Sequence, residues 1–275
     1  MSNQQLETVI VGGAGKTGRR VEQRLKALGV PVRLASRSSA LPFDWNDERT
    51  WAECLRGARA LYLTYFPDLA ARGASARIGR ASRLAAEAGV ERIVLLSGRG
   101  EHQVWPAERA MRDAGVPCTV VRCAWFAQNF SEGLLLEPIL QGELTLPAGN
   151  VAEPFIHLDD VADVVTAALT DPRHAGHIYD LTGPRLITFS EACREISLAS
   201  DRFVSYRSVS SEEYAATLAP FMPAEDVRFL VELFVSILDG HNALLTDGVQ
   251  RALGRPARDF SDYVTRAAAA GAWKV

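Results

Sequence analysis

This chain of 275 residues lacks the features that mark several broad classes of protein. Its four cysteines are scattered without a C-x-x-C pair, which argues against disulfides and against a metal site and predicts buried, unreactive thiols. Thirty lysine and arginine residues stand against 33 acidic ones, and no basic block is present, so nucleic-acid binding has no electrostatic support. No run approaches 18 apolar residues, and residues 1–5 do not resemble a secretory leader, so we expect a cytoplasmic protein without a membrane partner.

Short β-forming runs alternate with helical patterns from residue 6 to about 123. Hydrophobic residues make up 48% of the chain, enough for a sizeable core. The alternation is typical of the α/β class and predicts a Rossmann-like, doubly wound parallel sheet. The expected strands cover residues 8–11, 32–35, 60–64, 92–97 and 119–122, and the expected helices include 19–28, 70–88 and 107–114.

The strict alternation ends after residue 124. We therefore expect a dinucleotide-binding domain over residues 1–150, with its strand core at 6–123, followed by a small, mainly helical substrate lobe over 151–275 that does not fold separately. This lobe would cap the carboxyl ends of the strands, where open α/β sheets bind ligands, and the substrate site would lie between the two parts. Further short strands are expected at 144–146, 155–157, 178–181 and 203–208, and a helix at 161–169 with Asp159 or Asp160 as its N-cap.

The most informative segment is VIVGGAGKTG at residues 9–18, in which apolar β-formers lead into three glycines spaced G-x-x-G-x-x-G. The first glycine permits a tight turn, the second lets backbone N–H groups approach a pyrophosphate, and the third lets helix and strand pack closely. The helix that follows offers its positive N-terminal end to the anion. The residues assigned to phosphate binding are Gly12, Gly15, Lys16, Thr17 and Gly18.

The end of the second expected strand indicates which dinucleotide is bound. Cofactors without a 2′-phosphate are usually held there by an Asp or Glu, but this chain has Ser36 and Arg37. A carboxylate would repel a 2′-phosphate, whereas a guanidinium pairs with it and a serine hydroxyl adds a hydrogen bond. The sequence therefore predicts NADP(H), the alternative being that Arg37 is an ordinary solvated loop residue.

Four segments together carry a resemblance to a known family. They are residues 12–18, Ser-Arg-Ser at 36–38, FDWNDERTW at 43–51 and WFAQNF at 125–130. They resemble the NmrA-like branch of the atypical short-chain dehydrogenases, and within it the festuclavine and agroclavine dehydrogenase group of ergot-alkaloid biosynthesis and its bacterial relatives. The resemblance covers nearly the whole chain and is strong to about residue 170.

The resemblance implies roles for several residues at strand ends. Asp44 and Trp45 resemble residues after a third strand that meet the adenine, although Asp44 is equally well explained as a helix cap. Thr64 and Tyr65 follow a fourth strand, where the backbone passes the cofactor ribose. Ser97 ends a fifth strand, where short-chain dehydrogenases keep a catalytic Ser or Thr, the alternative being a hydroxyl that satisfies local backbone.

The chain departs from that family at the proton donor. Short-chain dehydrogenases that act on alcohols and ketones use Y-x-x-x-K after the serine, and residues 97–112, SGRGEHQVWPAERAMR, contain neither tyrosine nor lysine. Only Trp105 and Arg109 share the spacing, and tryptophan cannot act as an acid. Glu101 or His102 would be the candidate donors, or both are simply solvated after a glycine-rich turn.

Aromatic residues near the strand ends suggest a pocket for a flat or cationic substrate. The residues assigned to it are Phe66, Trp105, Trp125, Phe126 and Asn129, with core packing an equal alternative for Trp125. We therefore expect an NADPH-dependent reductase of a small organic molecule, with an iminium, imine or activated C=C bond, in secondary metabolism. A quinone or azo reductase and a non-catalytic NADP(H) sensor are the alternatives, and the sequence leaves the oligomeric state open.

Overall fold

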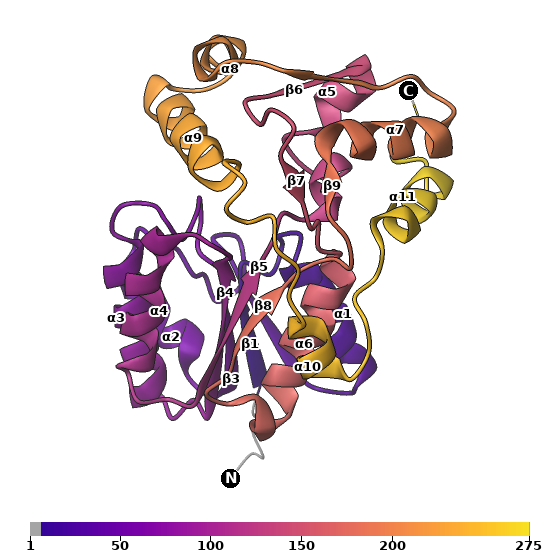
Figure 1. Ribbon diagram of the computed structural model, residues 1–275. Helices are drawn as coiled ribbons and strands as arrows, with labels where there is room; N and C mark the ends of the chain where they lie inside the picture. The colour runs from indigo at the N-terminus through magenta and orange to yellow at the C-terminus, as the bar shows by residue number, and fades with distance from the viewer. Residues whose placement is uncertain (1–6, 275) are drawn as a thin grey trace. The chain divides into compact units, whose positions relative to one another are not determined.

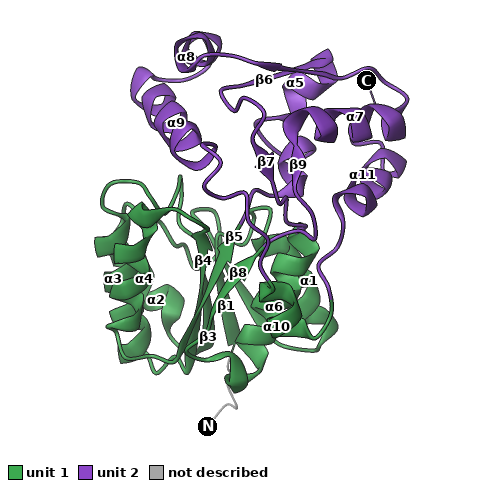
Figure 2. Cartoon of the chain, viewed as in Figure 1, with its two compact units in different colours: residues 1–123, 158–181, 247–255 green, residues 124–157, 182–246, 256–275 purple. Residues whose placement is uncertain are grey.

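The computed structural model describes residues 7–274 and divides the chain into two compact units (Figures 1 and 2). Unit 1 contains the residues up to Cys123, Leu158–Leu181 and Asp247–Arg255, and unit 2 contains the rest. The expected single boundary near residue 150 does not describe these units, because later segments return to complete unit 1. Whether the lobe depends on unit 1 for folding stays a prediction.

Unit 1 is built on a six-stranded sheet in the order β2-β1-β3-β4-β5-β8, with every neighbouring pair parallel. The expected Rossmann-like α/β fold is therefore confirmed. The strand order reverses at β1, which lies between β2 and β3, and such a switch point is where doubly wound sheets bind ligands. The strands are β1 (Glu7–Val11), β2 (Val32–Ala35), β3 (Ala58–Leu63), β4 (Arg92–Gly98), β5 (Cys118–Cys123) and β8 (Ile178–Leu181).

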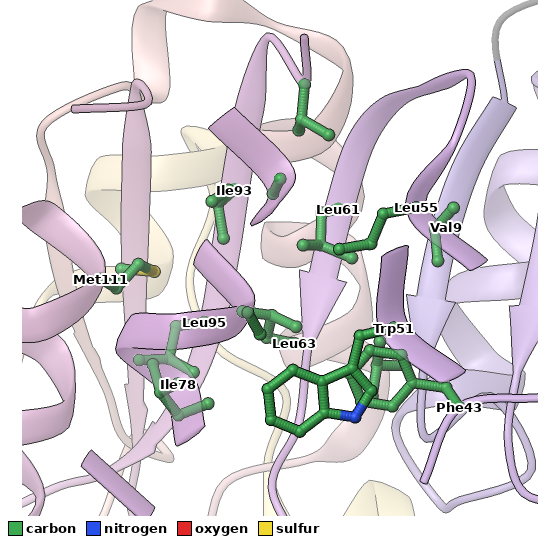
Figure 3. Packing of buried hydrophobic residues seen from close by; sticks show 14 of the residues in the cluster. Val9, Phe43, Trp51, Leu55, Leu61, Leu63, Ile78, Ile93, Leu95 and Met111 are labelled. Carbon is green, nitrogen blue, oxygen red and sulfur yellow. The ribbon is translucent and has the colours of Figure 1, made fainter. Parts of the chain in front are cut away.

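Helices cover both faces of this sheet (Figure 1). Because side chains alternate along a strand, Leu61 and Leu63 of β3 point to the same face, where they pack with Trp51, Ile78 and Met111 of the covering helices (Figure 3). Burial on both faces explains why the strand sequences are nearly continuously apolar. One face carries α2 (Trp51–Leu55), α3 (Ala74–Glu87) and α4 (Trp105–Arg112), and the other carries α1 (Gly18–Ala27), α6 (Leu158–Thr170) and α10 (Gly248–Leu253).

Unit 2 combines helices with two small sheets. Its core is rich in aromatic rings: Phe155 packs edge-on against Phe130 and Phe189 with ring centroids 5.2 and 5.3 Å apart, and the Trp273 indole donates to the Phe130 carbonyl. The strands are β6 (Glu143–Leu146), parallel to β10 (Ser205–Ser208), and β7 (Ala152–Glu153), antiparallel to β9 (Ile187–Thr188). The helices are α5 (Leu136–Gln141), α7 (Phe189–Ser200), α8 (Ser211–Leu218), α9 (Ala224–Ile237) and α11 (Phe260–Ala269).

Two local expectations in the second half of the chain are wrong. The strand expected at 155–157 is only a single bridge, in which Ile156 pairs with Phe126. Asp159 and Asp160 do not cap α6, because the helix begins at Leu158 and both lie inside its first turn. Asp160 is fully buried and pairs with Arg255 of the same unit, so a tertiary ion pair, not a cap, explains its carboxylate.

The cysteines are free, as far as residues 7–274 are concerned. Burial raises the pKa of the Cys54 thiol to about 11 and that of Cys193 to about 12, so both stay protonated and unreactive at neutral pH. None of the helices in this range is long and apolar enough to span a membrane. Residues 1–5, on which the leader argument rests, and residue 6 of the expected strand core lie outside the described range, and the cytoplasmic location stays a prediction.

Candidate cofactor site and active site

The glycine turn after β1 contains two glycines that the fold itself requires. Gly12 has a φ of +76°, and a Cβ there would lie 2.2 Å from Thr64 Oγ1. A Cβ on Gly18 would lie 2.5 Å from the Gly12 carbonyl oxygen, so this glycine lets α1 start against the turn. Gly15 differs, since it is exposed and its Cβ would meet only the Gly12 oxygen, at 3.1 Å. Its missing side chain therefore matters most for a ligand that approaches the backbone.

The first turn of α1 suits a phosphate group. Thr17 precedes the helix and its hydroxyl makes no capping bond, and the first turn contains no acidic residue. The positive end of the helix is thus not neutralised by its own side chains. Together with the bare backbone at Gly15, this arrangement fits the pyrophosphate of a dinucleotide.

The switch point of the sheet brings three predicted cofactor residues together. Thr64, directly after β3, donates its hydroxyl to the Val11 carbonyl at 3.0 Å, and the Trp45 indole donates to the Thr64 carbonyl at 3.1 Å. Tyr65 lies with its ring centroid 4.9 Å from that of Trp45, and its hydroxyl accepts from Arg77. Gly12, Trp45 and Thr64 therefore form one packed group beside the glycine turn.

Asp44 and Trp45 lie in the loop between β2 and β3, so the expected placement after a third strand is wrong. The chain forms only an isolated bridge there, between Asp44 and Asp47, so Thr64 directly follows the third strand of the chain and Ser97 lies in the fourth, one residue before its end. Asp44 is not a helix cap either. Its carboxylate accepts from the Asn46 backbone, while Asp47 caps the short helical turn Glu48–Thr50.

Arg37 is exposed at the end of β2, and no residue within 7–274 forms an ion pair or hydrogen bond with its side chain. Arg33, in the strand itself, is by contrast paired with Glu7 and two backbone carbonyls. Ser36 lies beside Arg37, and its hydroxyl contacts that of Ser39 at 2.9 Å. A free guanidinium next to a serine turn fits a phosphate monoester, as the missing carboxylate predicts.

Ser97 does not present a free hydroxyl. It is 5% exposed and donates to Glu108 Oε1 at 2.7 Å, and Glu108 is 1% exposed. Arg122, which lies beside Ser97 on β5, forms a bidentate pair with Glu108 at 2.8 and 2.6 Å. The alternative considered for Ser97, a hydrogen bond to local backbone, is thus wrong, because the hydroxyl bonds to a buried carboxylate instead. The catalytic role of Ser97 stays a prediction. Sequence reasoning missed both residues: Arg122 is the one charge in an otherwise largely apolar strand, whereas Glu108 lies in a helix that also contains Arg109 and Arg112 and has no distinguishing signal.

The helix that follows, α4, offers tryptophan and arginine at the four-residue spacing. Trp105 is 46% exposed, with the His102 ring edge-on at 4.4 Å and the Arg122 guanidinium 5.8 Å from its centroid. His102 is exposed. A cavity of about 360 Å³ on this face is lined by His102, Trp105, Pro106, Arg109, Ala110 and Asp113.

Glu101 is half-buried, so the alternative of a fully solvated side chain after the glycine-rich turn is not supported. Its Oε2 atom is buried and has no hydrogen-bond partner among residues 7–274. Burial, followed by the nearby Asp68 carboxylate, raises the pKa of Glu101 to about 8. Glu101 is therefore largely protonated at neutral pH.

The predicted pocket residues are divided between the units. Phe66, 76% exposed, and Trp105 belong to unit 1, whereas Trp125, Phe126 and Asn129 belong to unit 2. Trp125 packs edge-on between Phe189 and Phe234, with centroids 5.7 and 5.0 Å away, so the core-packing alternative is supported. A common pocket for these five residues stays a prediction.

No protein-family model matches this chain. An uncharacterised oxidoreductase of Bacillus subtilis is 29% identical over 275 residues, covering 95% of each chain. Agroclavine dehydrogenase of Claviceps fusiformis is 29% identical over 276 residues, 94% of this chain and 96% of the relative. An NAD(P)H azoreductase of Xenophilus azovorans is 26% identical over 288 residues, 95% of this chain and 98% of the relative. The resemblance to the clavine dehydrogenases and their bacterial relatives is confirmed.

Solved structures share the fold at low sequence identity. Triphenylmethane reductase of Citrobacter sp., complexed with NADP(H), matches with a TM-score of 0.76 and 20% identity over 95% of this chain and 100% of that one. An NADPH-dependent quinone oxidoreductase of Escherichia coli, complexed with NADPH, gives 0.78 and 19% over 94% and 99%. A doubly substituted NmrA gives 0.72 and 16% over 98% and 97%.

Proposed function

We propose that this protein is an NADP(H)-dependent reductase of a small organic molecule. The choice of NADP(H) rests mainly on Arg37. Its guanidinium is exposed at the end of β2, next to the glycine turn, and has no partner among residues 7–274. Gly12, Gly15 and Gly18 supply the phosphate turn. The relatives named as dehydrogenase and azoreductase support a reductase, and the neighbours solved with NADP(H) support the cofactor.

The reducible bond that we propose is a polarised C=N or C=C bond, as in secondary metabolism. Reduction of a simple ketone by the usual tyrosine-based mechanism is disfavoured because α4 contains no tyrosine or lysine and because the Ser97 hydroxyl is engaged with Glu108. Hydride addition to a ketone leaves an alkoxide that needs a proton donor, whereas an iminium yields a neutral amine directly. The agroclavine dehydrogenase relative supports this class.

Two further candidates each have one observation in their favour. A quinone or azo reductase is favoured by the azoreductase relative and the quinone oxidoreductase neighbour. A non-catalytic NADP(H) sensor is favoured by the NmrA neighbour and by the missing Tyr and Lys.

The test uses the purified full chain. Calorimetric titration with NADPH and NADH comes first, and we expect at least tenfold tighter binding of NADPH. NADPH oxidation is then followed with cyclic imines, enones, quinones and an azo dye. Turnover of an imine or enone supports the proposal, turnover of only quinones or the dye supports the first alternative, and tight binding without turnover supports the sensor. Equal affinity for both dinucleotides overturns the assignment of Arg37.

A further inference from the structure

The carboxyl end of the sheet in unit 1 contains an acid that the proposed function does not use. Glu101 lies three residues beyond the end of β4, and Asp68 lies in the segment that follows β3, the neighbouring strand. The glycine turn and Thr64 lie at the same sheet edge, because the carboxyl ends of parallel strands share one edge. Glu101 is therefore on the side of the sheet where the proposed dinucleotide binds.

Gly98 gives the Glu101 side chain its position. A Cβ at residue 98 would lie 1.9 Å from Glu101 Oε1, so only a glycine lets the carboxyl group lie against the end of β4. The other oxygen, Oε2, is shielded from solvent and has no hydrogen-bond partner among residues 7–274. An ionised carboxylate would leave that oxygen uncompensated, whereas a protonated acid needs no positive partner and has an O–H to donate.

The charged group that acts on Glu101 is another carboxylate, Asp68. Asp68 is the charged group whose field raises the pKa of Glu101, after the larger effect of burial. Burial also raises the pKa of Asp68, and a hydrogen bond of 2.8 Å from the Ala70 backbone to its carboxylate partly offsets that rise. Two close carboxyl groups do not both ionise readily, so Asp68 keeps the negative charge and Glu101 keeps the proton.

The other groups at this edge are less suited to give a proton. The Ser97 hydroxyl donates to Glu108, and Glu108 is paired with Arg122. His102 is exposed on the α4 side. Tyr65 accepts a hydrogen bond from Arg77 and is the rival that an experiment must separate from Glu101.

We propose that Glu101 is the proton donor of the reduction and that the substrate is a C=C bond conjugated to a carbonyl group, as in an enone. This inference rests on the proposed NADPH-dependent reduction. NADPH gives a hydride to the β-carbon and becomes NADP⁺, and the π electron pair moves to the carbonyl oxygen. The enolate formed takes the proton of the Glu101 carboxyl group, whose O–H bond breaks, and water later returns a proton to the carboxylate. Asp68 acts through Glu101, as a positioning residue.

The first test needs neither cofactor nor turnover. In the apoprotein labelled with ¹³C at glutamate carboxyl carbons, we expect one resonance to titrate near pH 8. It should be missing in Glu101→Gln and should titrate at lower pH in Asp68→Asn. If every glutamate resonance titrates below about pH 6, the proposal is overturned.

The second test compares substrates. With cyclohexenone, Glu101→Gln should lose about 100-fold in kcat with its Kd for NADPH within twofold, and the loss of wild-type kcat above about pH 8 should vanish. With the N-methylpyrrolinium cation, which needs no proton, both proteins should be equal. A loss in Tyr65→Phe that exceeds that in Glu101→Gln assigns the proton to Tyr65. If the wild type reduces only the cation, this inference fails and the proposed function stands; if it reduces none of the probes, the proposed function fails, and the titration still tests Glu101.

Discussion

The pair formed by Glu108 and Arg122 gives the sharpest test of how the strand ends of unit 1 are held. Arg122→Met keeps much of the side-chain volume and removes the charge. Glu108 is 1% exposed and would lose two hydrogen bonds, of 2.8 and 2.6 Å, while Ser97 at 2.7 Å and Arg112 at 3.5 Å remain. Removing one partner of a buried pair costs about 3–5 kcal/mol, and because two donors remain we expect a cost of about 3 kcal/mol here.

The assay is urea unfolding at neutral pH, followed by circular dichroism and tryptophan fluorescence. Arg112→Met is the matched control, because that arginine is 46% exposed and only 3.5 Å from the same carboxylate, so its loss should cost less than about 1 kcal/mol. The double variant Glu108→Met, Arg122→Met should recover much of the stability, since no buried charge is left unpaired. An Arg122→Met protein as stable as Arg112→Met would refute the reasoning.

The remaining predictions concern the serine, the cofactor turn and the raised pKa. Ser97→Ala should cost about 1 kcal/mol of stability and less than tenfold in turnover, whereas a catalytic serine would cost ~100-fold or more. Arg37→Asp should weaken the binding of NADPH, measured by calorimetry, by about 2 kcal/mol and leave the binding of NADH nearly unchanged. Equal losses of affinity for the two dinucleotides would mean that Arg37 does not contact the 2′-phosphate. Gly15→Val should abolish NADPH binding at an unchanged Tm, while Gly12→Ala should also lower Tm, because its Cβ would meet Thr64 at 2.2 Å. The pKa of Glu101 is about 8 in the folded chain, against 4.5 for the free side chain, so between these pH values the folded state binds a proton that the unfolded state has lost. The free energy of unfolding should therefore fall by up to about 1.4 kcal/mol per pH unit as pH rises from about 4.5 to about 8. Glu101→Gln should remove that part of the slope, and parallel curves for the two proteins would contradict it.

The sequence by itself determined the local and periodic features of this protein. The five strands of the first half were expected within two residues of where they lie, because buried parallel strands give continuous apolar runs between glycine-terminated helices. Gly18 could be singled out from spacing alone, since a Cβ there would meet only Gly12 and Gly13 of the same turn, whereas the contact that excludes a Cβ at Gly12 comes from Thr64, after another strand. Arg37 could be singled out as a candidate by the carboxylate that is missing after β2, and its contact with a 2′-phosphate stays a prediction.

Only the tertiary structure decided which distant side chains meet. Glu108 and Arg122 lie 14 residues apart, and Glu101 and Asp68 are farther apart still, on segments that adjoin because β3, β4 and β5 are neighbours in the sheet. The same holds for Asp160, which was expected to cap a helix and instead pairs with Arg255 in a segment that returns to unit 1. Sequence periodicity does not predict such contacts, because the burial of an ionisable group depends on strand order and on how the chain crosses between strands. Strand order and chain crossings therefore determine whether Glu101 is a solvated carboxylate or a protonated acid.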